Sequence, residues 1–277
     1  MRAATWNVQG RAGAWQERQS AIVRVLDELA PDVVTLQESW VEPDGRTQAS
    51  VLAAELGMQS VSAAALAGFD RYPAAPYWVV NAVLSRWPVA LEAAVPLHDE
   101  HGEPTWRHAL VTRVLRPDAE GGSFVVVGTH LEHGLDRSAT RRAQLTHLVT
   151  TVVDVLGDRP TRAADLPAVL AGDLNAVPWS DEVRSLTGAS VPLVEGCVFV
   201  DAWEAAGNTD RGATWSSANP RVPKRAVYPD RRLDYVLVSW PRRQGAGHVA
   251  ACYLVGTEPV AGVWPSDHFC VVADLDL

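Results

Sequence analysis

The sequence LPAVLAGDLNAVP spans residues 166 to 178. It begins as a run of Leu, Val and Ala, a composition typical of a strand buried on both faces of a sheet. Behind the run, Asp173 and Asn175 stand two residues apart, before a proline. Such side chains either bond to their own backbone in a turn or line a site at a sheet edge. This stretch alone leaves both interpretations open.

Similar short apolar runs, rich in Val, Leu and Ala, recur from one end of the chain to the other. They are AATWNV (3–8), DVVTLQES (32–39), VVNAVLS (79–85), HALVTRVL (108–115), SFVVVGTHL (123–131), LPAVLAGDL (166–174), CVFVDAW (197–203), RLDYVLVS (232–239), GHVAACYLV (247–255) and FCVVADLDL (269–277). Their length and β-branched content predict strands, and their nearly continuous hydrophobicity predicts burial on both faces.

Two segments between these runs have helical periodicity. Residues 15–29 place Ile22, Leu26 and Leu29 on one face, and residues 139–156 carry a similar apolar stripe. That second stripe consists of Leu145, Leu148, Val149, Val152 and Leu156. Segments rich in Gly, Pro and Asp predict loops at 42–46, 98–105, 117–122 and 207–231. We therefore expect one α/β domain over residues 1–277, with two stacked sheets and helices outside.

The composition is that of a globular protein with a substantial core, since 47% of the 277 residues are hydrophobic. No run approaches the roughly 18 apolar residues of a membrane span, and the first residues lack the apolar stretch of a signal peptide. We therefore expect a cytoplasmic monomer with no membrane segment. The cysteines Cys197, Cys252 and Cys270 are odd in number and lie in apolar runs, which predicts buried free thiols.

The net charge of −9 argues against a protein that coats nucleic acid by charge alone. Residues 211–243 nevertheless carry a local excess of basic side chains. These are Arg211, Arg221, Lys224, Arg225, Arg231, Arg232, Arg242 and Arg243, against Asp230 and Asp234. The segment is either a phosphate-facing surface or a solvated loop with scattered arginines.

Polar residues recur where the predicted strands begin or end. They are Asn7, Glu38, His130, Asp173, Asn175, Asp234, Asp267 and His268. Strand ends on one rim of a sheet converge in space, and sites on α/β scaffolds are built there. Carboxylate and amide oxygens without cysteine suit Mg²⁺ or Mn²⁺, and histidines beside carboxylates suit proton transfer or phosphate contact. Phosphoryl transfer needs this combination.

Six short motifs carry a resemblance to a known family over essentially the whole chain. In order they are TWNVQG (5–10), LQES (36–39), GTHLEH (128–133), GDLNAVP (172–178), RRLDYVLVS (231–239) and SDHFCVVADL (266–275). The series resembles the endonuclease/exonuclease/phosphatase superfamily of DNase I-like enzymes. The resemblance implies a four-layer α/β sandwich, with two mostly antiparallel sheets face to face and helices outside. It also implies hydrolysis of phosphoester bonds with a divalent cation, Mg²⁺ or Mn²⁺.

The resemblance assigns roles to the strand-end residues. Glu38 would be the principal metal ligand, with Asn7 and Asp267 in its immediate surroundings. This metal set follows from the family pattern and not from the spacing of the residues.

The remaining strand-end residues would carry out the chemistry. Asp173 would orient or activate the attacking water, and Asn175 would hold a phosphate oxygen or a second metal. His268 would be the general base or a phosphate contact, with Asp234 fixing its tautomer. His130 would hydrogen-bond the phosphate and stabilise the transition state.

Two further positions follow from the same resemblance. PTWRHALVTRV looks like the family strand whose leading arginine contacts phosphate, which assigns Arg107 to phosphate binding. VVNAVLSRWP resembles the strand that places Asn81 beside His130. DNase I-like members supply a carboxylate partner for that histidine from this strand, and PYWVVN offers none. The departure puts a strict nuclease mechanism in question.

Several functions remain open. A nuclease would use a basic, aromatic-lined groove, for which 211–243 and YPAAPYW (72–78) are candidates. A sphingomyelinase-like lipid phosphodiesterase would need an exposed apolar hairpin, for which 63–80 is the only candidate. A small-molecule phosphatase is a further alternative. A non-catalytic binding protein on the same fold is the alternative of another class, but the complete set of strand-end acids and histidines favours an enzyme.

Overall fold

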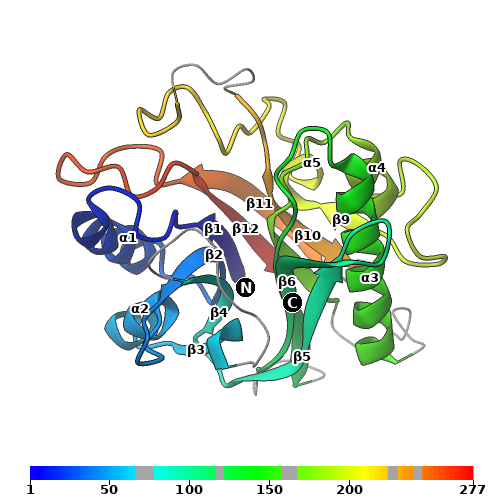
Figure 1. Cartoon of the computed structure of the whole chain (residues 1–277), viewed down its shortest axis with the longest axis horizontal. Helices are drawn as coiled ribbons and strands as arrows, with labels where there is room; N and C mark the ends of the chain where they lie inside the picture. Colours follow the sequence, from blue (N-terminus) through cyan, green and yellow to red (C-terminus); the bar gives the residue numbers. More distant parts are fainter. Residues whose placement is uncertain (66–77, 117–121, 158–166, 224–229, 240–244, 277) are drawn as a thin grey trace.

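Two sheets of six strands each form the centre of the computed structural model (Figure 1). The structure describes residues 1–65, 78–116, 122–157, 167–223, 230–239 and 245–276. The predicted loop 117–122 and the aromatic segment 72–78 lie almost entirely outside the described residues.

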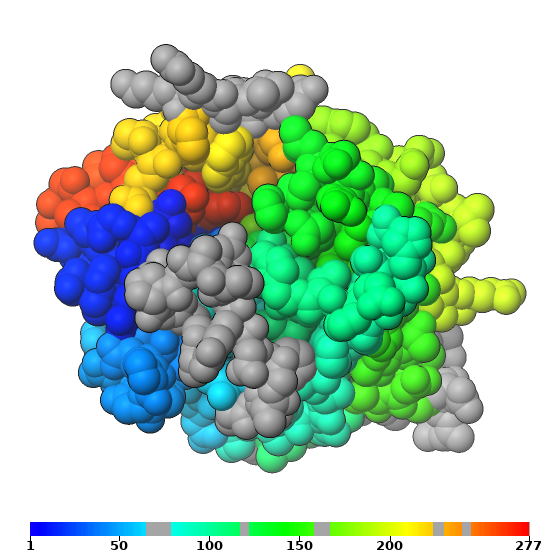
Figure 2. Space-filling view, in the orientation of Figure 1, coloured from blue at the N-terminus to red at the C-terminus, as the bar shows by residue number. Residues whose placement is uncertain are grey.

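The first sheet has the strand order β11-β12-β1-β2-β4-β3. Its strands are β1 Arg2–Asn7, β2 Val33–Val41, β3 Gln59–Ser62, β4 Trp78–Ser85, β11 His248–Val255 and β12 Cys270–Asp276. Only β1 and β2 pair in parallel, and the other pairs in this sheet are antiparallel. Because β12 pairs with β1, the two ends of the chain lie near each other (Figure 1). In Figure 2 the blue surface of the N-terminal segment adjoins the orange and red surface of the C-terminal segment.

The second sheet has the strand order β5-β6-β7-β8-β10-β9. Its strands are β5 Val89–His98, β6 Pro104–Leu115, β7 Ser123–His130, β8 Val169–Asp173, β9 Phe199–Asp201 and β10 Asp234–Ser239. Here β7 and β8 are the parallel pair, and the remaining pairs are antiparallel.

Helices cover the outer faces of both sheets, which completes the expected four-layer sandwich (Figure 1). They are α1 Trp15–Leu29, α2 Gln48–Leu56, α3 Ser138–Leu156 and α4 Asp181–Leu186. The short helix α5 Ala202–Ala205 instead packs Ala202 and Trp203 into the apolar layer between the sheets, and a 3₁₀ turn spans Ala63–Ala65. In Figure 1, α1 and α2 lie outside the first sheet, and α3 and α4 lie outside the second. Within the described residues, no helix is both long and apolar enough to cross a bilayer.

Local sequence explains where the helices begin and end. The Thr47 side chain caps α2 by accepting the Ser50 N–H. The Ser50 hydroxyl accepts the Thr47 N–H, which completes a capping box. Ala30 ends α1 in the left-handed conformation, just before Pro31. Both helices predicted from periodicity are present, and the second begins one residue earlier than expected.

Three apolar layers hold the sandwich together. Phe124 and Val236 belong to the layer between the sheets, Ile22 packs in the layer under α1 and α2, and Leu148 packs in the layer under α3 and α4. Strand β8 serves two of these layers, because Ala171 faces the first sheet and its neighbours in sequence face α3.

The strand register places the predicted polar residues on one rim. Strands β1, β2, β7 and β8 end at this rim, and β10 and β12 begin there, since they run antiparallel to their neighbours. Asp173 lies directly opposite His130 on one side and Asp234 on the other. In the first sheet, Asn7 lies opposite Gln37. Segments far apart in sequence thus meet at one end of the sandwich.

The expectation of burial on both faces is wrong for β11. His248 and Ala250 are exposed and only Cys252 is buried, because β11 is an edge strand with one face toward solvent. Strands β3 and β5 have no counterpart among the predicted runs. In strand β5 only Val95 and Leu97 are buried, and the strand contains Pro96, so its sequence does not resemble that of a strand buried on both faces.

Gly172 is required by the parallel pairing of β7 and β8. A Cβ at this position would lie 2.0 Å from the Thr129 carbonyl oxygen, whereas a Cβ at Gly128 would meet the side chains of Thr35 and Val83 at 3.5 Å. We expect Gly172→Ala to lower the free energy of unfolding by about 3 kcal/mol, because backbone must move. Gly128→Ala, the control, should change it by less than about 1 kcal/mol. Urea unfolding followed by tryptophan fluorescence measures both, and equal losses would contradict this explanation.

Candidate active site

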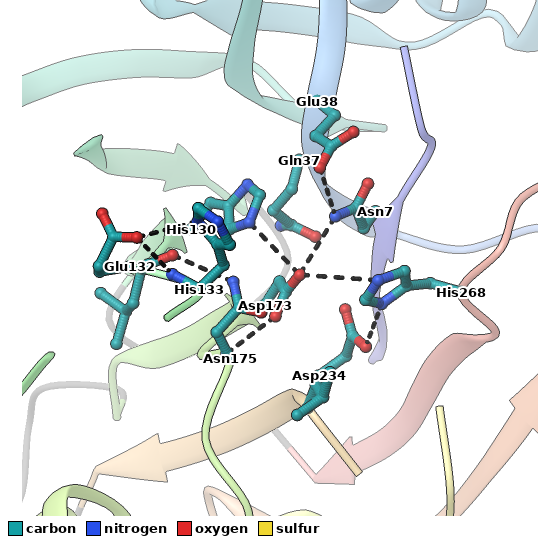
Figure 3. A network of polar contacts seen from close by, with 12 residues as sticks. Asn7, Gln37, Glu38, His130, Glu132, His133, Asp173, Asn175, Asp234 and His268 are labelled. Atoms are coloured by element: carbon teal, nitrogen blue, oxygen red, sulfur yellow. Dashed lines mark hydrogen bonds and ion pairs between the residues drawn. The ribbon is translucent and has the colours of Figure 1, made fainter. Parts of the chain in front are cut away.

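The strand-end residues form one network of polar contacts at the rim of the sandwich (Figure 3). Asn7 and Glu38 come from the first sheet, and His130, Asp173 and Asp234 come from the second. All five lie together, although the first and the last of them are more than 200 residues apart in the sequence. Loops that follow or precede strands add Asn175, Asp267 and His268.

Asp173 is the centre of the network. Its Oδ2 accepts a hydrogen bond from Asn7 Nδ2 at 3.1 Å and lies 3.4 Å from His130 Nε2. The same oxygen is 3.9 Å from His268 Nε2, while Oδ1 accepts the Asn175 N–H at 2.9 Å. Burial, followed by the nearby Asp234 carboxylate, raises the pKa of Asp173 to about 7. This carboxyl group therefore changes charge near neutral pH.

His268 is held by a carboxylate on each side. Its Nδ1 donates to Asp234 Oδ2 at 2.8 Å, and Thr214 Oγ1 accepts the backbone N–H of Asp234. Burial alone would lower the pKa of His268, but Asp234 and Asp173 outweigh it and hold this pKa well above the usual value of 6.5. The imidazole is therefore protonated at neutral pH.

His130 has the opposite charge state. Burial, followed by the positive Arg107 and His268, lowers the pKa of His130 well below 6.5. Its ring packs edge-on against Trp106, with centroids 6.3 Å apart. Asp173 therefore lies between a neutral imidazole, that of His130, and a charged imidazole, that of His268.

Glu38 lies at a break in the regular pairing of β2. The register with β4 shifts between Leu36 and Ser39, and Glu38 adopts a left-handed backbone with φ of 56°. This bulge turns the carboxylate toward Asn7, whose Nδ2 donates to Glu38 Oε1 at 3.1 Å. Burial, followed by the Asp267 carboxylate, raises the pKa of Glu38. A carboxylate whose charge is disfavoured by burial and by a second carboxylate provides a place for a cation of hard character.

Asp173, Asp234 and His268 form another cluster with metal-ligand atoms. Among the described residues, this trio is the only group of at least three such side chains whose ligand atoms all lie within 4.8 Å of one another. Hydrogen bonds already occupy one ring nitrogen of His268 and both oxygens of Asp173. The half-buried Glu38 therefore fits a cation better than this trio does.

Asn175 joins two loops at the rim. It has a left-handed backbone with φ of 50°, and its Nδ2 donates to the Leu131 carbonyl at 3.1 Å. Asparagine adopts this conformation more readily than most residues. Its backbone N–H also bonds to Asp173, so it holds the loop after β8 against the loop after β7.

A small pocket adjoins the network. Its lining consists of Glu38, Val79, Val80, Asn81, Trp106, Arg107, His108 and His130. The Arg107 guanidinium stacks 3.6 Å from the centre of the Trp106 ring and has one nitrogen 3.5 Å from His133 Nδ1. Arg107 and Asn81 therefore line the same pocket as His130, and the sequence predicts Asn81 as a neighbour of His130.

The sequence did not predict the part that His108 plays. Its Nε2 accepts the Asn81 N–H at 3.1 Å, and its carbonyl accepts from Asn81 Nδ2 at 2.7 Å. Burial, followed by Arg107, lowers the pKa of His108 to about 4, so the ring stays neutral. Its position directly after Arg107 was the only available signal. Gln37, opposite Asn7, is likewise buried and hydrogen-bonded to Thr5, and no pattern in the sequence distinguishes it.

The basic segment contributes arginines to the scaffold. Arg221 Nε donates to Gln9 Oε1 at 2.7 Å, and Arg232 forms a buried ion pair with Asp201 at 2.6 Å. These two side chains therefore support neighbouring loops and strands. Lys224, Arg225, Arg242 and Arg243 lie outside the described residues.

Solved structures share this architecture over almost their whole length. Truncated Caenorhabditis elegans TDP2 superposes with a TM-score of 0.71 at 21% identity, covering 98% of this chain and 96% of that chain. D. rerio TDP2 complexed with a single-strand DNA product gives 0.73 at 19% identity, covering 100% and 99%. The human Nocturnin catalytic domain with bound sulfate gives 0.71 at 19% identity, covering 100% and 94%. At these identities the likeness establishes the fold.

Sequence comparison gives the family. Protein angel of Drosophila melanogaster is 26% identical over 192 residues, which are 63% of this chain and 48% of that protein. The matched region thus spans about half the length of that curated relative. The model of the Endonuclease/Exonuclease/phosphatase family matches residues 4–268, which include every residue of the network. The chain belongs to the endonuclease/exonuclease/phosphatase family.

Proposed function

We propose that this chain is a phosphodiesterase that depends on Mg²⁺ or Mn²⁺ and cleaves P–O bonds in nucleic acid. The observation that carries the proposal is the position of Asp173 between a neutral and a charged imidazole, beside the Glu38 carboxylate. Phosphoryl transfer needs an activated water, donors for the phosphate oxygens and positive charge near them. These residues can supply all three when a cation is bound.

The cation would be held by Glu38 and Asp267, with Asn7 beside them. Asn7 keeps the Glu38 carboxylate in place through its Nδ2 donor, and Asp267 lies close enough to raise the pKa of Glu38. A bound divalent cation would act as a Lewis acid and neutralise charge on the transferring phosphoryl group. Oxygen ligands without sulfur favour Mg²⁺ or Mn²⁺ over softer metals.

Asp173 is the proposed base. Its pKa of about 7 suits a group that takes a proton from water near neutral pH. Asn7 and the Asn175 N–H fix the two carboxylate oxygens, which restricts the direction from which water can approach.

The two histidines are the proposed phosphate contacts. His130 is neutral and can donate one hydrogen bond, while the His268 imidazolium brings a positive charge and a proton that can go to the leaving oxygen. Asp234 fixes the orientation of the His268 ring by accepting from its Nδ1. Arg107 would bind further phosphate oxygens from the Trp106 side of the pocket.

The proposal of a nucleic acid substrate is supported by a structural neighbour. D. rerio TDP2, which shares the fold, was solved with a single-strand DNA product. The partly exposed Trp106 and the Arg107 stacked on it are also suited to contact a base and a phosphate. We further propose that residues 1–277 act as one catalytic domain, since the family match runs from residue 4 to residue 268. We also propose that this domain acts as a monomer.

Removal of the Glu38 carboxylate tests the proposed cation site. Wild-type protein should hydrolyse bis-p-nitrophenyl phosphate and single-stranded DNA with Mg²⁺ or Mn²⁺ and lose this activity in EDTA. Glu38→Ala should lower kcat/KM by at least about a thousandfold, because Lewis-acid stabilisation worth several kcal/mol is lost. Glu55→Ala, an exposed control on α2, should retain the wild-type rate. Unchanged turnover by Glu38→Ala would contradict the assignment.

Removal of the His268 imidazole tests the proposed chemistry. We expect His268→Ala to lower kcat by at least about a hundredfold, the lower range for a group that transfers a proton. Binding of Mn²⁺ should be retained, because Glu38 is still present. His147→Ala, an exposed histidine on α3, is the control. A loss below about threefold would remove His268 from the mechanism.

A further inference from the structure

Arg18 is a buried arginine of α1 that uses its guanidinium to hold two loops of the site. It is 1% exposed, and it donates to five backbone carbonyls. These bonds run from Nε to Ala12 O (3.2 Å), from one terminal nitrogen to Val8 O (2.8 Å) and Pro265 O (3.0 Å), and from the other to Gln9 O (3.1 Å) and Gly10 O (2.6 Å). The five bonds engage every nitrogen of the planar guanidinium.

The first loop follows Asn7 directly. Gln9 and Gly10 both have a left-handed backbone, with φ of 54° and 43°, and Arg18 binds the carbonyl of each. A glutamine in this conformation is strained, so outside contacts must hold it. The Gln9 N–H in turn donates to Asn7 Oδ1 at 3.1 Å, which directs Asn7 Nδ2 toward Glu38. Arg18 therefore influences the orientation of the Asn7 amide.

The second loop carries Asp267 and His268. Arg18 binds it at Pro265, one residue before Ser266, whose hydroxyl donates to the Asn7 carbonyl at 2.6 Å. Trp6 Nε1 donates to the His268 carbonyl at 2.9 Å and so fixes the far end of the loop. Both loops thus depend on buried donors from β1 and α1.

We propose that Arg18 is a positioning residue. It sets the distance from Asp267 to the pair formed by Asn7 and Glu38, and so sets the affinity of the site for a divalent cation. The inference rests on the cation site proposed above. Loss of the guanidinium would leave several buried carbonyls without donors, and the two loops would move to recover hydrogen bonds elsewhere. Residues that orient metal ligands from behind commonly change metal affinity by about ten- to a hundredfold.

The chain offers a matched control in Arg2. This arginine also connects α1, β1 and β12, because it donates to the Leu29 carbonyl and to the Asp274 carboxylate. It does so at the opposite end of β1 from Asn7. Arg2 therefore joins α1, β1 and β12 directly, whereas Arg18 joins α1 to the loops after β1 and before β12, at the rim that carries the site.

Binding of Mn²⁺ tests the inference without relying on activity. In electron paramagnetic resonance titrations, Arg18→Met should bind Mn²⁺ at least about tenfold more weakly than wild type. Arg2→Met should bind within about twofold of wild type. Arg18→Lys, which keeps the charge but cannot reach both loops with a planar fork, should also lose several-fold in affinity. Far-ultraviolet circular dichroism establishes that each variant is folded.

The outcomes separate this inference from the proposed function. Wild-type protein that binds no Mn²⁺ would overturn the cation site itself. Wild-type binding together with equal affinity in folded Arg18→Met would overturn the role of Arg18 alone. If Arg18→Met does not fold, Arg18→Lys decides, and wild-type affinity in that variant would overturn the inference. Guanidinium ion added at millimolar concentration to folded Arg18→Ala should restore Mn²⁺ binding, since it can occupy the vacated space between the carbonyls.

Discussion

The site depends on one buried carboxylate, that of Asp173, which the strand register places between His130 and Asp234. An ionised carboxylate in such a position is costly, and the neighbouring Asp234 increases that cost. The surroundings offset it with the Asn7 amide, the Asn175 N–H and the His268 imidazolium. The result is an acid whose pKa is about 7, poised to accept a proton near neutral pH.

The sandwich makes this arrangement possible because parallel pairs occur at the centre of each sheet. In β1 with β2, and in β7 with β8, two strands end at the same rim, so polar residues from both can meet. Backbone at this rim departs from regular structure at Gln9, Glu38 and Asn175, which all have positive φ. Non-glycine residues in this region are uncommon, and they persist where surrounding contacts hold them. Here they direct side chains into the site.

Much of this could be predicted from the sequence. The order of the apolar runs and of the six motifs was sufficient for the four-layer sandwich, and the strand-end acids and histidines were the residues that the structure brings together. Edge strands were harder. Strand β5 buries one face or less, so its composition resembles that of a loop. Strand β11 also buries one face or less, but its composition resembles that of a core strand.

The supporting residues could not be predicted for a different reason. Arg18 resembles any charged residue on a helix until the carbonyls of two distant loops are seen around it. His108 supports the site through Asn81, a contact between two sheets that leaves no local pattern in the sequence. Charge states were equally hidden, since His130 and His268 differ only in the groups that face them.

The proposed position of the divalent cation, at Glu38 and not within the trio of Asp173, Asp234 and His268, can be observed in crystals soaked in MnCl₂ and measured at the manganese absorption edge. We expect an anomalous peak about 2.0 to 2.6 Å from a Glu38 carboxylate oxygen, the range for oxygen ligands to Mg²⁺ and Ca²⁺. A peak coordinated only by the trio, or no peak at saturating Mn²⁺, would contradict the proposed position.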